Sequence, residues 1–249
     1  MKTVVVIQAR MGSTRLPGKV LADLGGRPLL GLQLARLECL PDARIVVATS
    51  DRPGDDAVAA LAAEYGVPCV RGPEHDVLSR FALAVAAHPG DEVVRLTADC
   101  PLTDAGLVEA VLALRRATDA DYAGNTLIRT FPDGLDVEVM TAATFAAVDR
   151  EATDPLDREH VTRFVLRHPQ RFRSANLRAP RPLAAERWTV DTIEDLERVR
   201  EIVAALDDPV GAAWDEVLAC AGTTTRSCED PVQTDVVADL TLDQLLQEA

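Results

Sequence analysis

The chain has 249 residues, of which 47% are hydrophobic, and this is enough to bury the core of one domain. Its formal net charge of −14 argues against general affinity for nucleic acid or anionic membranes, so an anionic ligand needs local positive charge. The five cysteines include no CxxC pair, which argues against structural zinc and a disulfide framework. No apolar run reaches the roughly 18 residues of a membrane span, and the first is too short for a signal peptide. We therefore expect a cytoplasmic protein.

Short apolar runs alternate with helical patterns along the first half of the chain. Four runs are β-branched and nearly all apolar, as expected of strands buried on both faces of a parallel sheet: 3–9, 43–50, 67–72 and 91–99. Helical periodicity follows each of them, at 28–40, 54–66, 76–88 and 104–117. This alternation predicts right-handed βαβ units and an α/β fold with a doubly wound, mostly parallel sheet.

The second half has a looser pattern. Residues 121–141 predict loops and antiparallel strands, as part of a small extension over about 121–170. Helices are expected at 157–169 and within 187–206, where Thr192 and Asp195 have the spacing of a capping box. We expect one domain over 1–221 and an acidic tail over 222–249. The tail is expected to be partly disordered and to end in a short docking helix.

A basic loop, "IQARMGSTRLPGKVL" (7–21), leaves the first predicted strand and contains no acid. Ligands of open parallel sheets bind beyond the carboxyl ends of the strands, where this loop begins. Gly12 and Gly18 permit close backbone approach to an anion, Arg10 and Arg15 offer planar forks, and Lys19 offers a point charge. The alternative is a solvated basic turn; we interpret the loop as a phosphate site. Its spacing fits neither the Walker A nor the Rossmann motif.

Two aspartates are candidate metal ligands. Asp99 ends the fourth predicted strand, so its carboxylate should face the same crevice as the basic loop. Mg²⁺ beside nucleotide phosphates takes one or two protein carboxylates. The alternative for Asp99 is a turn-opening residue before Pro101. Asp191 precedes the predicted capping box, where it either favours the helix dipole or supplies a second carboxylate. Spacing alone leaves both alternatives open.

The basic loop closely resembles the opening motif of the sugar cytidylyltransferases, which include CMP-KDO synthetases and acylneuraminate cytidylyltransferases. The fuller match resembles the spore-coat polysaccharide biosynthesis branch of that superfamily. It rests on six segments in order: "VVVIQARMGSTRLPGKVL", "VVRLTADCPL", "DYAGNT", "FPDGLDVEV", "DREHVTRFV" and "RWTVDTIEDLE". The resemblance covers residues 1 to about 220. It implies the A-type nucleotide-diphospho-sugar transferase fold and a nucleotidyltransferase that uses CTP, Mg²⁺ and a sugar acid or related acceptor.

The resemblance also implies roles for individual residues. It implies that Arg10, Arg15 and Lys19 bind the triphosphate and that Asp99 and Asp191 hold the magnesium ion. It also implies that the backbone around Ile7–Ala9 and the segment near Arg71–Arg80 enclose the base. The implied nucleotide-binding set comprises Ile7, Gln8, Ala9, Arg10, Gly12, Arg15, Lys19, Arg71 and Arg80. The chain departs from the KDO and sialate enzymes in "GPEHDVLSR" and in Gln8, where those enzymes have proline. In the implied reaction, an acceptor hydroxyl attacks the α-phosphorus of CTP and pyrophosphate leaves.

Candidate acceptor-binding residues lie in "PDGLDVEV" and "REHVTRF". Asp133, Asp136 and Glu138 are able to accept hydrogen bonds from sugar hydroxyls, although a turn and an alternating strand explain their spacing equally well. His160 and Arg163 share one face of the predicted helix and are placed either to bind an acceptor carboxylate or to make a packing or subunit contact. The resemblance also implies a homodimer.

Two other classes of protein stay open. The first is a glycosyltransferase that uses a nucleotide sugar, or a nucleotidyltransferase for another base; "TADCP" supplies one aspartate where a glycosyltransferase usually has D-x-D. The second is a catalytically silent nucleotide-binding or scaffold protein. The presence of three loop cations and both aspartates argues against it.

Overall fold

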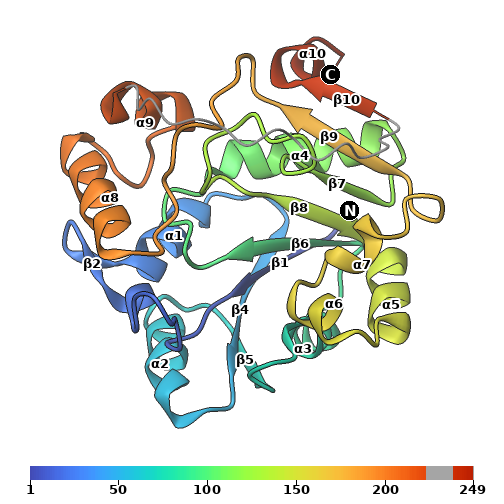
Figure 1. Ribbon diagram of the computed structural model, residues 1–249, viewed down its shortest axis with the longest axis horizontal. Helices are drawn as coiled ribbons and strands as arrows, with labels where there is room; N and C mark the ends of the chain where they lie inside the picture. Colours follow the sequence, from blue (N-terminus) through green and yellow to red (C-terminus); the bar gives the residue numbers. More distant parts are fainter. Residues whose placement is uncertain (223–237, 249) are drawn as a thin grey trace.

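The computed structural model describes residues 1–222 and 238–248. Its centre is an eight-stranded sheet with the order β10-β9-β7-β8-β6-β1-β4-β5 (Figure 1). The four predicted strands are confirmed as its parallel half: β1 (Thr3–Gln8), β4 (Ala43–Ser50), β5 (Cys69–Gly72) and β6 (Glu92–Thr97). Strand β1 pairs in parallel with both β4 and β6, so its carboxyl end lies between the carboxyl ends of those two strands at one sheet edge.

The predicted antiparallel extension is built into the same sheet. Strand β8 (Glu138–Thr141) runs antiparallel to β6 and to β7 (Tyr122–Gly124), and β9 (Ser174–Arg178) pairs in parallel with β7. The mixed sheet confirms the predicted fold class. A separate two-stranded antiparallel sheet pairs β2 (Asp23–Leu24) with β3 (Arg27–Pro28).

Helices cover both faces of the sheet and define two apolar clusters. One cluster, around Val5, Ile7 and Ala9, packs under helices that include α1, α4 and α8. The other, around Val4 and Val6, packs under α3, α5 and α7. Because successive strand residues point to opposite faces, β1 contributes to both clusters, and Gln8 follows Val4 and Val6 onto the second face.

The helices have these bounds: α1 Leu29–Leu37, α2 Asp56–Glu64, α3 Val77–Ala87, α4 Ala105–Ala117, α5 Ala142–Glu151, α6 Pro155–Glu159, α7 Arg163–Leu166, α8 Ile193–Ala205, α9 Trp214–Ala221 and α10 Leu242–Glu248. Two 3-10 helices are η1 (Lys19–Leu21) and η2 (Pro53–Asp55). The capping box predicted at Thr192 and Asp195 is confirmed at the start of α8. None of the described helices is long and apolar enough to cross a membrane.

The single helix predicted over 157–169 is wrong. The structure has α6 and α7 instead, separated by Val161, whose φ of 42° lies in the left-handed region. A β-branched residue adopts this conformation only under tertiary constraint. The constraint is visible next to it, where the Thr162 hydroxyl donates to buried Glu138 at 2.7 Å. The break therefore also removes the shared helix face predicted for His160 and Arg163.

The C-terminal segment adds a strand and a helix that the sequence pattern only partly indicated. Strand β10 (Ala238–Thr241) pairs in parallel with β9, and α10 follows it (Figure 1). Leu245 of α10 is 4% exposed and belongs to the main apolar cluster, which agrees with the predicted docking helix. Most of the tail predicted to be partly disordered, 223–237, lies outside the described residues.

Candidate active site

The basic loop folds back on itself directly after β1. Gly18 adopts a φ of 74°, and its amide donates to the Met11 carbonyl at 3.0 Å, which closes the loop. The Met11 amide donates in turn to Asp55 Oδ1 at 2.6 Å. Asp55 is 3% exposed and also accepts from the Ser50 amide, so the loop is anchored to the carboxyl end of β4. Asp55 was not predicted as a site residue, because it lies 44 residues from Met11 and has no motif of its own.

The loop turns Lys19 inward, where its ammonium group meets both predicted metal ligands. Lys19 Nζ donates to Asp99 Oδ2 at 3.2 Å, to Asp191 Oδ1 at 2.9 Å and to the Val190 carbonyl at 2.6 Å. These three bonds use all the donors of a lysine. One buried cation therefore joins two aspartates that are about ninety residues apart in the sequence.

Backbone contacts explain how the two aspartates meet. The Val190 amide donates to the Asp99 carbonyl at 2.8 Å, and Thr189 Oγ1 donates to the same oxygen at 3.2 Å. Gly134 lets the neighbouring turn approach this segment, because a Cβ at Gly134 would lie 2.5 Å from the Thr189 nitrogen. The segment before α8 is thus joined directly to the turn after β6.

Two arginines also contact Asp191. Arg15, which is largely exposed, pairs with Asp191 Oδ1 at 2.9 Å, and Arg187 donates to Asp191 Oδ2 at 2.7 Å. Burial raises the pKa of Asp191, but Lys19, Arg15 and Arg187 outweigh it, so the pKa lies below its ordinary value of 3.8. The carboxylate is therefore charged at neutral pH. No role was predicted for Arg187; its position four residues before Asp191 was the available signal.

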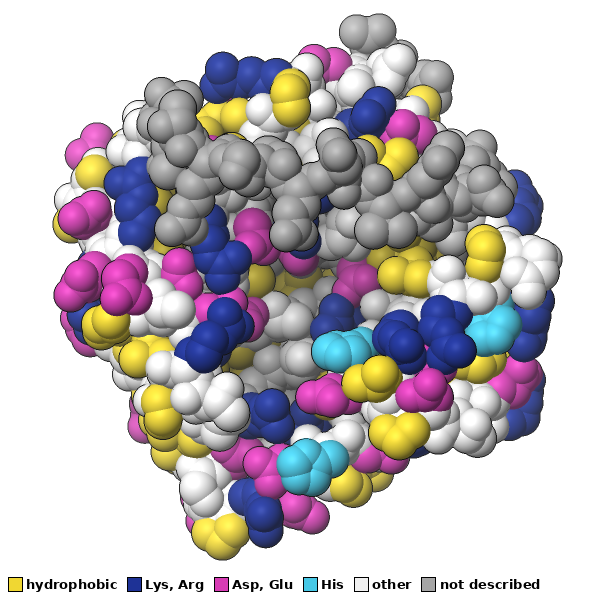
Figure 2. Space-filling view, viewed as in Figure 1, with side chains coloured by type: hydrophobic (Ala, Val, Ile, Leu, Met, Phe, Trp, Pro, Cys, Tyr) yellow, Lys and Arg dark blue, Asp and Glu magenta, His cyan; other side chains and the backbone are white. Residues whose placement is uncertain are grey.

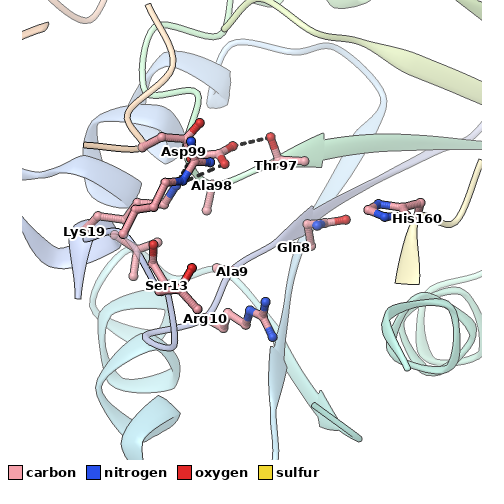
Figure 3. Close-up of a pocket in the computed structure, with 13 residues that line it drawn as sticks. Gln8, Ala9, Arg10, Ser13, Lys19, Thr97, Ala98, Asp99 and His160 are labelled. Atoms are coloured by element: carbon pink, nitrogen blue, oxygen red, sulfur yellow. Dashed lines mark hydrogen bonds and ion pairs between the residues drawn. The ribbon is translucent and has the colours of Figure 1, made fainter. Parts of the chain in front are cut away.

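The loop and the aspartates line one cavity of about 360 Å³. Figure 2 shows the corresponding hollow, with basic and acidic side chains around it. Figure 3 shows Lys19 and Asp99 together on one side, and Gln8 and His160 on the other. The predicted site residues that line this cavity are Gln8, Ala9, Arg10, Arg15, Lys19, Asp99, His160 and Asp191.

A smaller cavity of about 110 Å³ adjoins the first and shares Gln8, Ala9, Arg10 and His160 with it. Arg80 lines this smaller cavity and is 2% exposed. Its Nε and Nη1 atoms are buried and have no hydrogen-bond partner among the described residues. Burial lowers the pKa of Arg80, and the nearby Arg10 charge lowers it further. A buried guanidinium without acceptors calls for a ligand that supplies them.

Other predicted residues lie away from the cavities. Ile7 is fully buried in the core, and Gly12 is exposed in the basic loop. Arg71 donates to the Ser50 carbonyl and pairs with Asp56, and it lines neither cavity described above. Arg163 pairs with Asp157 at 2.5 Å. The backbone break at Val161 lies between Arg163 and His160.

The three acids predicted to bind the acceptor substrate all have partners within the protein. Asp136 accepts two bonds from Arg129, at 2.5 and 2.7 Å, and Asp133 pairs with Arg187. Burial raises the pKa of Asp133, and the Asp136 and Asp191 charges add to it, against the lowering effect of the arginines. Glu138 is 6% exposed and accepts from protein donors on both oxygens.

Comparison with known proteins shows which family the chain belongs to. The cytidylyltransferase family model matches residues 4–210. The chain belongs to the cytidylyltransferase family. It is 35% identical over 205 residues to the spore coat polysaccharide biosynthesis protein SpsF of Bacillus subtilis, covering 79% of this chain and 84% of SpsF. A cytidylyltransferase structure from Leptospira borgpetersenii has a TM-score of 0.83 at 32% identity, covering 87% of this chain and 92% of the other.

A more distant cytidylyltransferase shares the fold. The structure of CMP:2-keto-3-deoxy-manno-octonic acid synthetase complexed with CTP has a TM-score of 0.63 at 21% identity, covering 82% of this chain and 99% of the other. These comparisons confirm the resemblance seen in the sequence, the enzyme class and the fold.

The cavity of this cytidylyltransferase has a donor set that suits a magnesium ion bound with a nucleotide. The described residues contain no group of three or more acids, histidines or cysteines able to hold a metal alone. Asp99 and Asp191 instead share one bridging cation, Lys19, so their charges already converge on a cationic group. Mg²⁺ takes one or two carboxylates and completes its octahedron with phosphates and water. The pair therefore fits that ion in the presence of a triphosphate.

Proposed function

We propose that this cytidylyltransferase transfers CMP from CTP to a hydroxyl group of a sugar acid or related acceptor and releases pyrophosphate. The observation that supports this most is the bridge from Lys19 to Asp99 and Asp191, inside a cavity that other residues of the basic loop also line. Cations for phosphate oxygens and carboxylates for a divalent ion thus lie in one place. The CTP bound by the related synthetase supports the choice of nucleotide.

In the proposed reaction the acceptor hydroxyl oxygen forms a bond to the α-phosphorus of CTP. The bond from that phosphorus to the α,β-bridging oxygen breaks, the hydroxyl proton passes to solvent water, and pyrophosphate departs. Such a transfer needs positioning and charge neutralisation more than covalent help from the protein. Arg10, Arg15 and Lys19 supply positive charge to the phosphate oxygens. Bound Mg²⁺, held by Asp99 and Asp191, would neutralise further charge on the phosphates.

The base is proposed to enter the smaller cavity. Arg80 supports this assignment, because its buried donors require acceptors and a pyrimidine carbonyl supplies one. Ala9 and Val77 give the same cavity apolar walls, which suit a flat ring. The predicted enclosure of the base by residues 7–9 and by Arg80 is retained. Arg71 is proposed to support the β4 end rather than to contact the nucleotide.

The acceptor is proposed to meet Asp133, Asp136 and His160. His160 reaches the larger cavity, while the two aspartates carry partly exposed carboxylates next to the Asp191 group. We assign Glu138 and Arg163 supporting roles, because both are paired within the protein. The homodimer stays a prediction for sedimentation to test.

The decisive experiment measures pyrophosphate release from CTP and Mg²⁺ with a panel of sugar acids, including KDO-like and sialic-acid-like compounds. Calorimetric titrations with CTP, UTP, GTP and ATP accompany it and need no acceptor. Metal-dependent preference for CTP supports the proposal. Preference for another triphosphate would refute the cytidylyl assignment, and binding of nucleotide sugars alone would favour a glycosyltransferase.

A further inference from the structure

Gln8 is the last residue of β1 and lines both cavities. On the adjacent strand β6, Arg95 is the register partner of Val6 and so lies on the same face as Gln8, and its Nε donates to Gln8 Oε1 at 3.2 Å. A guanidinium group has donors and no acceptor, so the amide oxygen of Gln8 must face Arg95. The amide nitrogen then faces the other way, and the described residues give it no hydrogen-bond partner.

Arg95 is itself held in place by Glu138. Glu138 pairs with Arg95 Nη1, and the same carboxylate accepts from Tyr122 Oη at 2.8 Å and from Thr162 Oγ1 at 2.7 Å. Burial lowers the pKa of Arg95, but the charge and hydrogen bond of Glu138 outweigh it, so the pKa lies above its ordinary value. Arg95 stays charged, and the amide of Gln8 has no reason to flip.

The partly buried chain of contacts from Glu138 through Arg95 to Gln8 therefore fixes an N–H donor at the boundary of the two cavities. Arg80, in the smaller cavity, adds a second set of donors without partners. Figure 3 places Gln8 on the side of His160, apart from Lys19 and Asp99, so this donor is not part of the Lys19–Asp99 cluster. A ligand group bound at this boundary is therefore recognised through its own hydrogen-bond acceptor atoms.

We propose that Gln8 is a specificity-determining residue that donates a hydrogen bond to the pyrimidine base, with Arg95 and Glu138 as its positioning residues. This rests on the proposed function, which places CTP at the site. Cytosine presents adjacent acceptors, O2 and N3, whereas the N3 of uracil carries a proton and is a donor. Donors from Gln8 and Arg80 match the cytosine edge, and uracil sets its N3–H against one of them.

The test reverses the hydrogen-bonding sense of one side chain. In Gln8→Glu, one carboxylate oxygen keeps the contact with Arg95 and the other presents an acceptor to the base. The affinity ratio of CTP to UTP, measured by calorimetry with Mg²⁺, should fall by about 10- to 100-fold, because a matched bond becomes mismatched for cytosine and matched for uracil. Gln170→Glu, at an exposed position, adds the same charge and should keep the wild-type ratio.

The positioning role has its own variant. Glu138→Gln keeps an oxygen for Tyr122 and Thr162 but sets an amide N–H against Arg95, so the Gln8 amide is released. The CTP to UTP ratio should again fall, toward one, and the melting temperature should fall as well, because Arg95 loses its buried negative partner. A purely structural role would lower the melting temperature and leave this ratio unchanged.

The outcomes separate this inference from the proposed function. Wild-type protein that binds no CTP refutes the proposed function. Wild-type protein that prefers CTP, together with a Gln8→Glu variant of unchanged CTP to UTP ratio, overturns the role of Gln8 alone. A reduced ratio in Gln8→Glu and Glu138→Gln, but not in Gln170→Glu, supports it.

Discussion

Replacing Lys19 with methionine removes the ammonium group that bridges the two aspartates and keeps a chain of similar length. Lys19 is 8% exposed and contacts Asp99 at 3.2 Å and Asp191 at 2.9 Å. Two unit charges about 4 Å apart interact by about 1 kcal/mol even at the dielectric constant of water, so a divalent ion there is opposed by about 2 kcal/mol. Without nucleotide, Lys19→Met should therefore bind Mg²⁺ or Mn²⁺ about 30-fold more tightly than wild-type protein.

The same substitution should abolish useful turnover. Loss of one preorganised charge at the reacting phosphate typically costs about 10²- to 10³-fold in kcat. Titration calorimetry with Mn²⁺ measures the first effect, and pyrophosphate release measures the second. Lys2→Met is the matched control, because Lys2 is the chain's other lysine and is exposed. Unchanged metal affinity in Lys19→Met, or turnover near the wild-type rate, would refute this reasoning.

Further variants test the neighbouring contacts. Asp99→Asn should keep the fold, checked by circular dichroism, and remove transfer. Asp55→Asn loosens the anchor of the basic loop and should raise the KM for CTP by about tenfold, with a smaller change in kcat. Because the native pKa of Asp191 lies below 3.8, its stabilisation is complete above that value and is lost as pH falls through the native pKa. In Asp191→Asn, the melting temperature should therefore fall less than in wild-type protein as the pH is lowered through this range. Truncation after Gly222 should keep CTP binding but lower the melting temperature, because it removes buried Leu245.

Each of these variants has an outcome that contradicts it. Near-wild-type transfer by Asp99→Asn would remove Asp99 from the metal site. A KM that stays constant in Asp55→Asn would show that the loop holds its shape without this anchor. Parallel acid melting profiles for wild type and Asp191→Asn would assign the acid sensitivity elsewhere. Loss of CTP binding on truncation would contradict the predicted domain boundary. Leu245→Ala, which removes only the buried side chain, serves as the milder comparison for the truncation.

The sequence predicted the parts of the fold that depend on local patterns. The apolar runs around Val4–Val6 and in the other three strands identified the parallel half of the sheet, because strands buried on both faces must be continuously apolar. The capping box at Thr192 and Asp195 gave the start of α8, since its two hydrogen bonds join neighbouring residues. Strands β9 and β10 were missed, because their alternation is weak and their pairing lies across the sheet.

Local pattern failed where distant residues set the backbone. A helical periodicity runs through Val161, yet the backbone breaks there, where the Thr162 hydroxyl bonds to Glu138. The same carboxylate was predicted to meet an acceptor, but its burial with Arg95 and Tyr122 was not visible in a strand of alternating residues. Tertiary contacts override propensity at both positions.

The sequence by itself determined the chemical groups of this enzyme and its fold class: a basic loop after the first strand, two aspartates and a mostly parallel α/β sheet. Only the tertiary structure decided their arrangement. It joined Asp99 to Asp191 through one lysine, and it turned the amide of Gln8 toward the cavities through Arg95. The physical reason is that charge and hydrophobic period are properties of a segment, whereas a hydrogen-bond partner belongs to whichever segment the fold brings within about 3 Å.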